Sequence, residues 1–211
     1  MRPIFVSLLV FATPSVSWAQ PTSAKVDLAK DGGALMPIVL AKNASLRTRQ
    51  SAQTLADYLG KITGAKFGIV NGDGTSGIVI GLAKDLADVK APADLLSKDP
   101  TRAEDYWLHS HASGLYLLGA SEQAVEHAVW DALYRLGYRQ FFPGPTWEVI
   151  PNAKDLSLSV GRHEHPSYYA RRIWYGYGAA TWAAKPYADW CAKNRAKSEG
   201  QAVLGRQILT P

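Results

Sequence analysis

Residues 114–151 read GLYLLGASEQAVEHAVWDALYRLGYRQFFPGPTWEVIP. The apolar run 115–118 predicts a buried strand, and Ser121 then offers a hydroxyl that caps the free N–H groups of a helix. Gly137 is placed to end this helix. The helix carries a wide apolar stripe made of Ala124, Val125, Ala128, Val129, Ala132, Leu133 and Leu136. Because such a stripe needs a sheet to cover, the stretch predicts a helix packed on a sheet.

The end of this stretch is unusually aromatic. Two strand-like runs, 138–142 and 147–150, flank a Pro143-Gly144-Pro145 turn. The aromatic residues of the region are Trp130, Tyr134, Tyr138, Phe141, Phe142 and Trp147. They form either a packed structural corner or a ligand surface. We favour packing, because the helix stripe, its glycine stop and the following strand account for the pattern.

The upstream sequence predicts further elements of the same unit. Ser45 and Gly64 bracket a second amphipathic helix. The predicted strands are 37–41, 66–70 and 77–81, the last two around a Gly-rich turn, and a hairpin of 105–109 with 115–118. These elements predict an α/β fold, a two-layer α+β sandwich over residues 35–160. Its sheet has five or six strands, and both helices lie on one face.

Composition and charge exclude several classes. The 211 residues are 47% apolar and 19% charged, with a formal net charge of +5. The Lys and Arg residues are scattered, so no basic stripe for nucleic acid is predicted. The sole cysteine, Cys191, forms no disulfide within the chain. Gly72-Asp73-Gly74 precedes no Lys-Ser/Thr helix, so it is no phosphate loop, and no cofactor is expected.

The N-terminus has the layout of a secretory signal peptide over residues 1–19. Arg2 precedes an apolar run from 4 to 12, and small residues at 17 and 19 suit cleavage. The run is too short for a membrane anchor, and the alternative is a buried N-terminal helix. We therefore expect export to the periplasm or the extracellular space, and a flexible lead-in over residues 20–34.

Three segments carry a family resemblance. They are PIVLAKNASLRTRQSAQTLADYLGKITGAKFGIV, GIVIG and the stretch 114–151. Over residues 36–151 the chain resembles the N-terminal α/β domain (hexosaminidase-like domain 2) of family 67 α-glucuronidases and β-hexosaminidases. It is most similar to DUF4838 proteins, which share this layout. The resemblance implies a glycosidase-like barrel after the α/β domain.

The tail resembles the beginning of that barrel. Pro166, Tyr168 and Arg171 match the family's first barrel strand, and Trp190, Asn194 and Arg195 match a segment on the helix after it. We expect this helix over residues 187–197. Residues 161–211 would then be the first βα unit of a truncated (β/α)8, TIM-like barrel, since a whole barrel takes about 250 residues.

Two substrate-binding residues are expected, Arg171 from the resemblance and Trp174 from its aromatic side chain. The planar fork of Arg171 suits sugar hydroxyls, and the alternative is a structural ion pair with a carboxylate at the domain junction. Trp174 is either an aromatic platform for a sugar ring or core packing. The family's catalytic carboxylates lie on later barrel strands, so no catalytic residue is expected here. The acidic residues are expected in solvated or capping roles; they include Glu104, Asp105, Glu126, Asp131 and Glu148.

Two histidine pairs raise a metal hypothesis. His109 with His111 and His163 with His165 alternate in strand-like segments, as zinc ligands can. No third ligand is indicated, so no metal site is expected.

The resulting function hypothesis is an accessory N-terminal domain in an exported glycoside hydrolase-like protein. Such a protein acts on polysaccharides or oligosaccharides, and this chain by itself is expected to be inactive. A non-catalytic carbohydrate-binding module and a purely structural scaffold are the alternatives. Carbohydrate is the expected partner, and the oligomeric state is left open.

Overall fold

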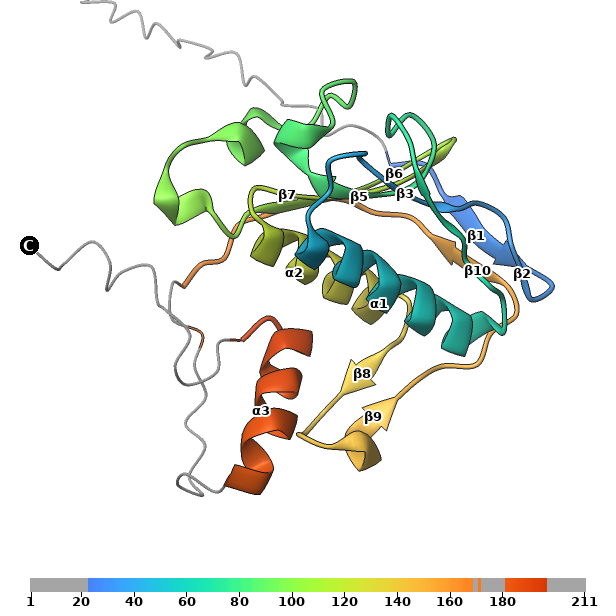
Figure 1. The fold of residues 1–211 in the computed structure, drawn as a ribbon. Coiled ribbons are helices and arrows are strands. Elements are labelled where there is room, and N and C mark those ends of the chain that lie inside the picture. The colour runs from blue at the N-terminus through green and yellow to red at the C-terminus, as the bar shows by residue number, and fades with distance from the viewer. Residues whose placement is uncertain (1–22, 169–170, 172–180, 197–211) are drawn as a thin grey trace, which may run out of the picture.

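The structure is a computed structural model that describes residues 23–168, 171 and 181–196. Its centre is a six-stranded sheet with helices α1 (Leu46–Thr63) and α2 (Glu122–Arg135) on one face (Figure 1). The strand order is β11-β6-β7-β5-β3-β4. The strands are β3 (Ile38–Leu40), β4 (Ile69–Asn71), β5 (Gly77–Leu82), β6 (Tyr106–His111), β7 (Gly114–Gly119) and β11 (Gly161–Glu164). The predicted α/β fold is confirmed.

The two helices begin and end at the predicted residues. Ser45 accepts a hydrogen bond from the Thr48 amide at 3.2 Å, and Ser121 accepts one from the Ala124 amide at 3.2 Å. Gly64, with φ of 78°, terminates α1 in the left-handed conformation that glycine adopts without steric cost. Local sequence therefore sets both helices in place.

The strands on either side of the Gly-rich turn do not pair with each other. Both β4 and β5 run parallel to β3, which lies between them. A Cβ added at Gly72 or at Gly77 would come within 2.8 Å of the Val39 side chain. The connection therefore passes against Val39 on its way from one side of β3 to the other, and glycine allows that close approach.

Apolar side chains fill both faces of the sheet. The helix face holds the largest fully buried residues, which include Ile38, Leu40, Leu55, Leu59, Ile62, Ile78, Ile80, Leu108, Leu115 and Leu117. On the other face, Val79 and Leu118 pack with Leu86 and Leu95 from the segment between β5 and β6. Burial on both faces explains why β5 is a continuous apolar run.

Residues expected to be a flexible lead-in are partly ordered. Strands β1 (Val26–Lys30) and β2 (Gly33–Ala34) form a three-stranded sheet with β10 (Leu156–Leu158). The prediction is wrong for residues 26–34, because Val26, Leu28 and Ala29 are buried in the core.

The boundary expected at residue 160 also falls inside the fold. Strand β11 pairs with β6 from Gly161 to Glu164, so the large sheet extends to Glu164. The sequence of this strand, Gly-Arg-His-Glu, gives no apolar signal, because none of its four residues is fully buried.

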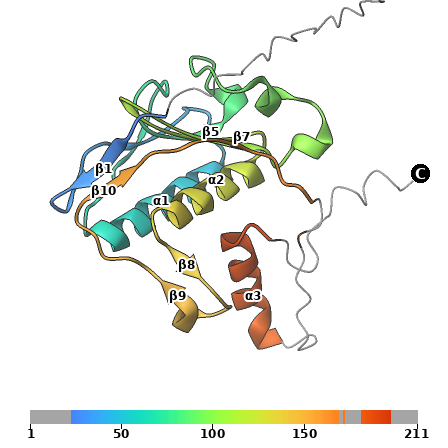
Figure 2. The same cartoon turned by 180° about the vertical axis from the view of Figure 1, so that it is seen from behind.

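Strands β8 (Arg139–Gln140) and β9 (Glu148–Val149) form a separate two-stranded ribbon. Helix α3 (Thr181–Lys193) lies beside it, beginning and ending earlier than the expected 187–197 (Figures 1 and 2). The expected packing of the aromatic stretch is confirmed for Trp130 and Tyr138, which are buried. It is wrong for Phe141, Phe142 and Trp147, which are exposed because the ribbon and its connection stand apart from the large sheet, and for Tyr134, which is exposed on α2.

No helix within the described ranges is long and apolar enough to cross a bilayer. The expected signal peptide, residues 1–19, lies outside the described residues.

Candidate functional site

Three buried carboxylates lie where α2 and β6 meet the chain that follows the sheet. Glu104 and Asp105 directly precede β6, and Asp131 lies on α2. Their side chains are 5%, 0% and 6% exposed. Solvated or capping roles were expected, so the expectation is wrong for these three residues. One sequence signal was available: Asp131 stands between Trp130 and Ala132 in an apolar helix, and a buried carboxylate needs cationic partners.

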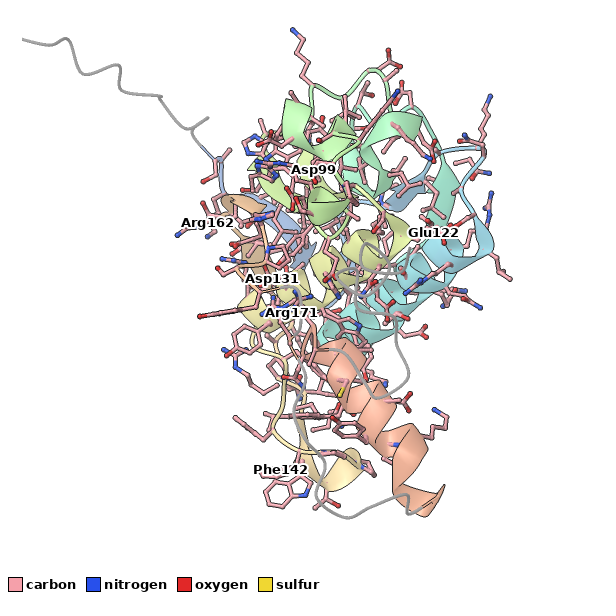
Figure 3. The ribbon with its side chains drawn as sticks, turned by 90° about the vertical axis from the view of Figure 1, so that its left-hand side faces the viewer. Asp99, Glu122, Asp131, Phe142, Arg162 and Arg171 are labelled. Atoms are coloured by element: carbon pink, nitrogen blue, oxygen red, sulfur yellow. The ribbon has the colours of Figure 1, made fainter. Side chains whose placement is uncertain are left out.

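Arg171 is one of these partners. Its Nη2 pairs with Oε2 of Glu104, its Nε donates to the Arg195 carbonyl at 2.9 Å, and its Nη1 donates to the Tyr168 carbonyl at 2.8 Å. Figure 3 shows Arg171 below Asp131, above helix α3. The structural ion pair that was the alternative for Arg171 is therefore formed in this structure. The other predicted substrate-binding residue, Trp174, lies outside the described residues.

Asp131 connects α2 to the turn after α3. It pairs with Arg135 at 3.1 Å and with Arg195 at 2.5 Å, and it accepts a hydrogen bond from the Tyr106 hydroxyl at 3.3 Å. Burial, and then the negative charge of Asp131, raise the pKa of Tyr106. Arg195 has φ of 55°, a left-handed conformation that is unfavourable for a side-chain-bearing residue. In this conformation the Arg195 side chain pairs with Asp131.

Asp105 contacts two histidines, His163 on β11 and His165 in the segment after it. Its carboxylate lies 3.1 Å from Arg102, 2.6 Å from Nδ1 of His165 and 3.6 Å from Nε2 of His163. These contacts hold β11 and the following residues to the start of β6. We call the set of Glu104, Asp105, Asp131 and their cationic partners the charged junction.

The other histidine pair lies on β6, the strand that pairs with β11. His109 and His111 stack with Tyr116 on β7, and His109 also stacks on Trp107 at 4.9 Å between ring centroids. Burial lowers the pKa of both histidines. Within the described ranges, no three His, Cys, Asp or Glu residues are placed to hold a metal ion. The two pairs belong to neighbouring strands, since His163 lies opposite Trp107 in the pairing of β11 with β6.

A second anchor lies between the ribbon and α3. Glu148 accepts hydrogen bonds from Tyr58 at 2.6 Å and Tyr138 at 2.8 Å, and pairs with Lys193 at 2.9 Å. Burial alone would raise the pKa of Glu148, but these hydrogen bonds and the Lys193 charge lower it to about 2. The Gln140 carbonyl accepts from Trp190 and Asn194 at 3.1 and 3.2 Å. Trp190 and Asn194, singled out in the sequence, thus attach α3 to β8.

A cleft of about 270 Å³ opens at the charged junction. Its walls include Tyr106, His127, Glu164, Arg171, Asn194 and Arg195. Glu164 in this cleft lies 3.4 Å from Arg135, and the three buried carboxylates have the arginine and histidine partners described above. Paired charges of this kind can hold two segments of the chain together. A wider groove of about 750 Å³ runs beside the C-terminal half of α1, away from these charges.

Comparison with known proteins gives a distant structural similarity. No family model and no curated protein matches the chain. Among solved structures, the chain is similar to the GH20 beta-N-acetylhexosaminidase from Streptomyces coelicolor A3(2), with a TM-score of 0.47 and 21% identity. The match covers 72% of this chain and 25% of that enzyme's chain. A similarity at this level assigns neither activity nor site, and the resemblance to DUF4838 proteins stays a prediction.

Proposed function

We propose that the α/β unit is a non-catalytic accessory platform whose charged junction holds the region that follows it, in an exported protein that acts on carbohydrate. One observation carries the platform role. Glu104 and Asp131 are buried, and Arg171 and Arg195 from the chain after the sheet pair with them.

The energetic argument is the cost of an unpaired buried charge. An isolated carboxylate loses several kcal/mol on leaving water, so removing its partner costs about 3–5 kcal/mol. The α/β unit therefore neutralises its buried carboxylates with Arg171 and Arg195 from the chain that follows, beside its own Arg102 and Arg135. A unit built in this way is suited to hold the chain that follows it in a fixed position.

The carbohydrate part of the proposal rests on the sequence resemblance. Arg171 as a sugar-binding residue belongs to the same part, and its contacts with Glu104, Tyr168 and Arg195 occupy all three guanidinium nitrogens in this structure. Export rests on the layout of residues 1–19.

Limited proteolysis of the full chain tests the platform role. Glu104→Gln removes the charge that holds Arg171, and we expect trypsin to cleave after Lys193 and Arg195 at least ~5-fold faster, while fragments of α1 and α2 stay protected. Glu126→Gln is the matched control, because Glu126 lies on α2 in a surface pair with Arg47. Arg171→Ala should reproduce the effect from the other side of the contact.

Equal cleavage rates in Glu104→Gln, Arg171→Ala and the control would refute the platform role. A separate assay tests the carbohydrate part. A panel of glycosides should show no hydrolysis by this chain, and sugar release would contradict the non-catalytic assignment. Binding of the full chain to a glycan array would favour the carbohydrate-binding alternative.

A further inference from the structure

The connection between β8 and β9, together with Val149 on β9, exposes large apolar side chains. Phe141 and Phe142 are each 60% exposed, Trp147 is 51% exposed and Val149 is 48% exposed. The rings of Phe142 and Trp147 lie 5.3 Å apart, and Phe142 points away from the body of the molecule at the tip of the ribbon (Figure 3). We call these four residues the aromatic patch.

The opposite face of the ribbon is already an interface. Gln140 and Glu148 are register partners, and Glu148 pairs with Lys193 of α3. Because side chains alternate along a strand, Val149, the neighbour of Glu148 on β9, faces away from α3. Contiguous exposed apolar surface of this kind commonly marks a contact surface.

The chain leaves the described region close to this patch. Asn194 donates to the Gln140 carbonyl, and the Arg195 guanidinium lies 5.9 Å from the Tyr134 ring centroid. Arg139, the register partner of Val149, covers the same Tyr134 ring at 3.5 Å. Residue 196 is therefore next to the ribbon, and the sequence continues with the remaining residues 197–211.

Those remaining residues include a short apolar segment. Residues 201–209 read QAVLGRQIL, in which Ala202, Val203, Leu204, Ile208 and Leu209 are apolar. The few residues between 196 and 202 span up to about 20 Å when extended, at about 3.3 Å per residue. The segment thus has both the reach and the side chains to cover the patch.

We infer that the aromatic patch is the docking surface for the chain's own segment 202–209. Burial of the leucines and Ile208 on Phe141, Phe142 and Trp147 removes apolar surface from water on both sides. This inference goes beyond the proposed function, since it concerns the outer face of the ribbon and needs none of the buried carboxylates.

Cross-linking in the full chain tests the inference. In a Cys191→Ala background, Val149→Cys is combined with Leu204→Cys and treated with a short bis-maleimide. Val70→Cys with Leu204→Cys is the matched control, because Val70 is 46% exposed on edge strand β4. We expect the Val149 pair to link within one chain at least ~10-fold faster than the control, owing to the raised effective concentration.

Substitutions in segment 202–209 supply a second test, measured by the same cross-linking rate. Ile208→Asp with Leu209→Asp should slow the Val149 cross-link to the control rate, whereas Gln201→Asp should leave it unchanged. Equal rates for the Val149 and Val70 pairs would overturn the inference. Links formed only between isotopically distinct chains would assign the patch to a second copy, and protection of the thiol of Val149→Cys by an added glycan would assign it to carbohydrate. Both outcomes also overturn it.

Discussion

The core under α1 and α2 and the charged junction beside α3 are both buried, yet they are held by different forces. The core consists of residues such as Leu55, Ile80 and Leu117, whose burial needs no specific partner. The junction consists of carboxylates such as Asp131, each of which needs a cation in one geometry. An apolar core tolerates exchange of its members, whereas a buried ion pair fails when either partner is lost.

Loss of a junction carboxylate should have the largest effect. Asp131→Ala leaves Arg195 and Arg135 without their buried partner and removes an acceptor from Tyr106. We expect the free energy of unfolding to fall by about 3–5 kcal/mol. Urea unfolding of the full chain measures this. A cost no larger than that of Glu126→Ala, a surface residue, would mean that the junction adds little to stability.

Truncation in the apolar core should cost slightly less. Leu117→Ala removes a fully buried side chain from β7, and we expect a loss of about 2–5 kcal/mol. The loss should not depend on salt, unlike that of Asp131→Ala, and urea unfolding at two ionic strengths checks both. Leu46→Ala is the control, because Leu46 is exposed at the start of α1. A strong salt dependence for Leu117→Ala would contradict the distinction.

Acid should weaken the second anchor selectively. The pKa of Glu148 is lowered from 4.5 to about 2. The ionised carboxylate therefore contributes fully to the free energy of unfolding above pH 4.5, and this contribution is lost as the pH falls through 2. The contribution amounts to about 3 kcal/mol. The difference in unfolding free energy between the wild type and Glu148→Gln should therefore be large at pH 6 and small near pH 2. A difference that is independent of pH would refute the ionic role of Glu148.

Substitution of the two helix-capping serines should have the smallest effect on stability, and the two costs should differ. Ser45 and Ser121 each accept a hydrogen bond from a helix amide, but Ser45 donates only to the nearby Thr48 hydroxyl, whereas Ser121 donates to the Ala103 carbonyl, next to Glu104. We expect Ser45→Ala to cost about 1 kcal/mol, and Ser121→Ala about 1 kcal/mol more. Thermal unfolding of both variants measures this. Equal costs would show that Ser121 does not connect α2 to the junction.

Local patterns predicted much of the fold. The stripe from Ala124 to Leu133 and the caps at Ser45 and Ser121 depend on neighbours within a few positions, so their structures follow from the sequence. Strand β11 was missed because its pairing with β6 joins residues far apart in the chain. The exposure of Phe141 and Trp147 was missed because it depends on the ribbon standing apart from the sheet.

The candidate site was only partly predictable. Arg171, Trp190 and Asn194 were singled out from sequence, and the structural partner was one of two roles considered for Arg171. The burial of Glu104, Asp105 and Asp131 was not expected. The apolar neighbours of Asp131 on its helix were a usable signal, but nothing in the sequence near Glu104 and Asp105 indicates the partners that the fold brings to them.

The sequence alone determined the α/β class, the two helices with their capping residues, and the apolar strands of the central sheet. Periodicity and capping are local properties, and the hydrophobic effect needs only a face to bury. The tertiary structure decided which strands are neighbours, which carboxylates are buried and which cations neutralise them. Those outcomes depend on contacts between distant segments, such as Glu104 with Arg171 and Glu148 with Lys193.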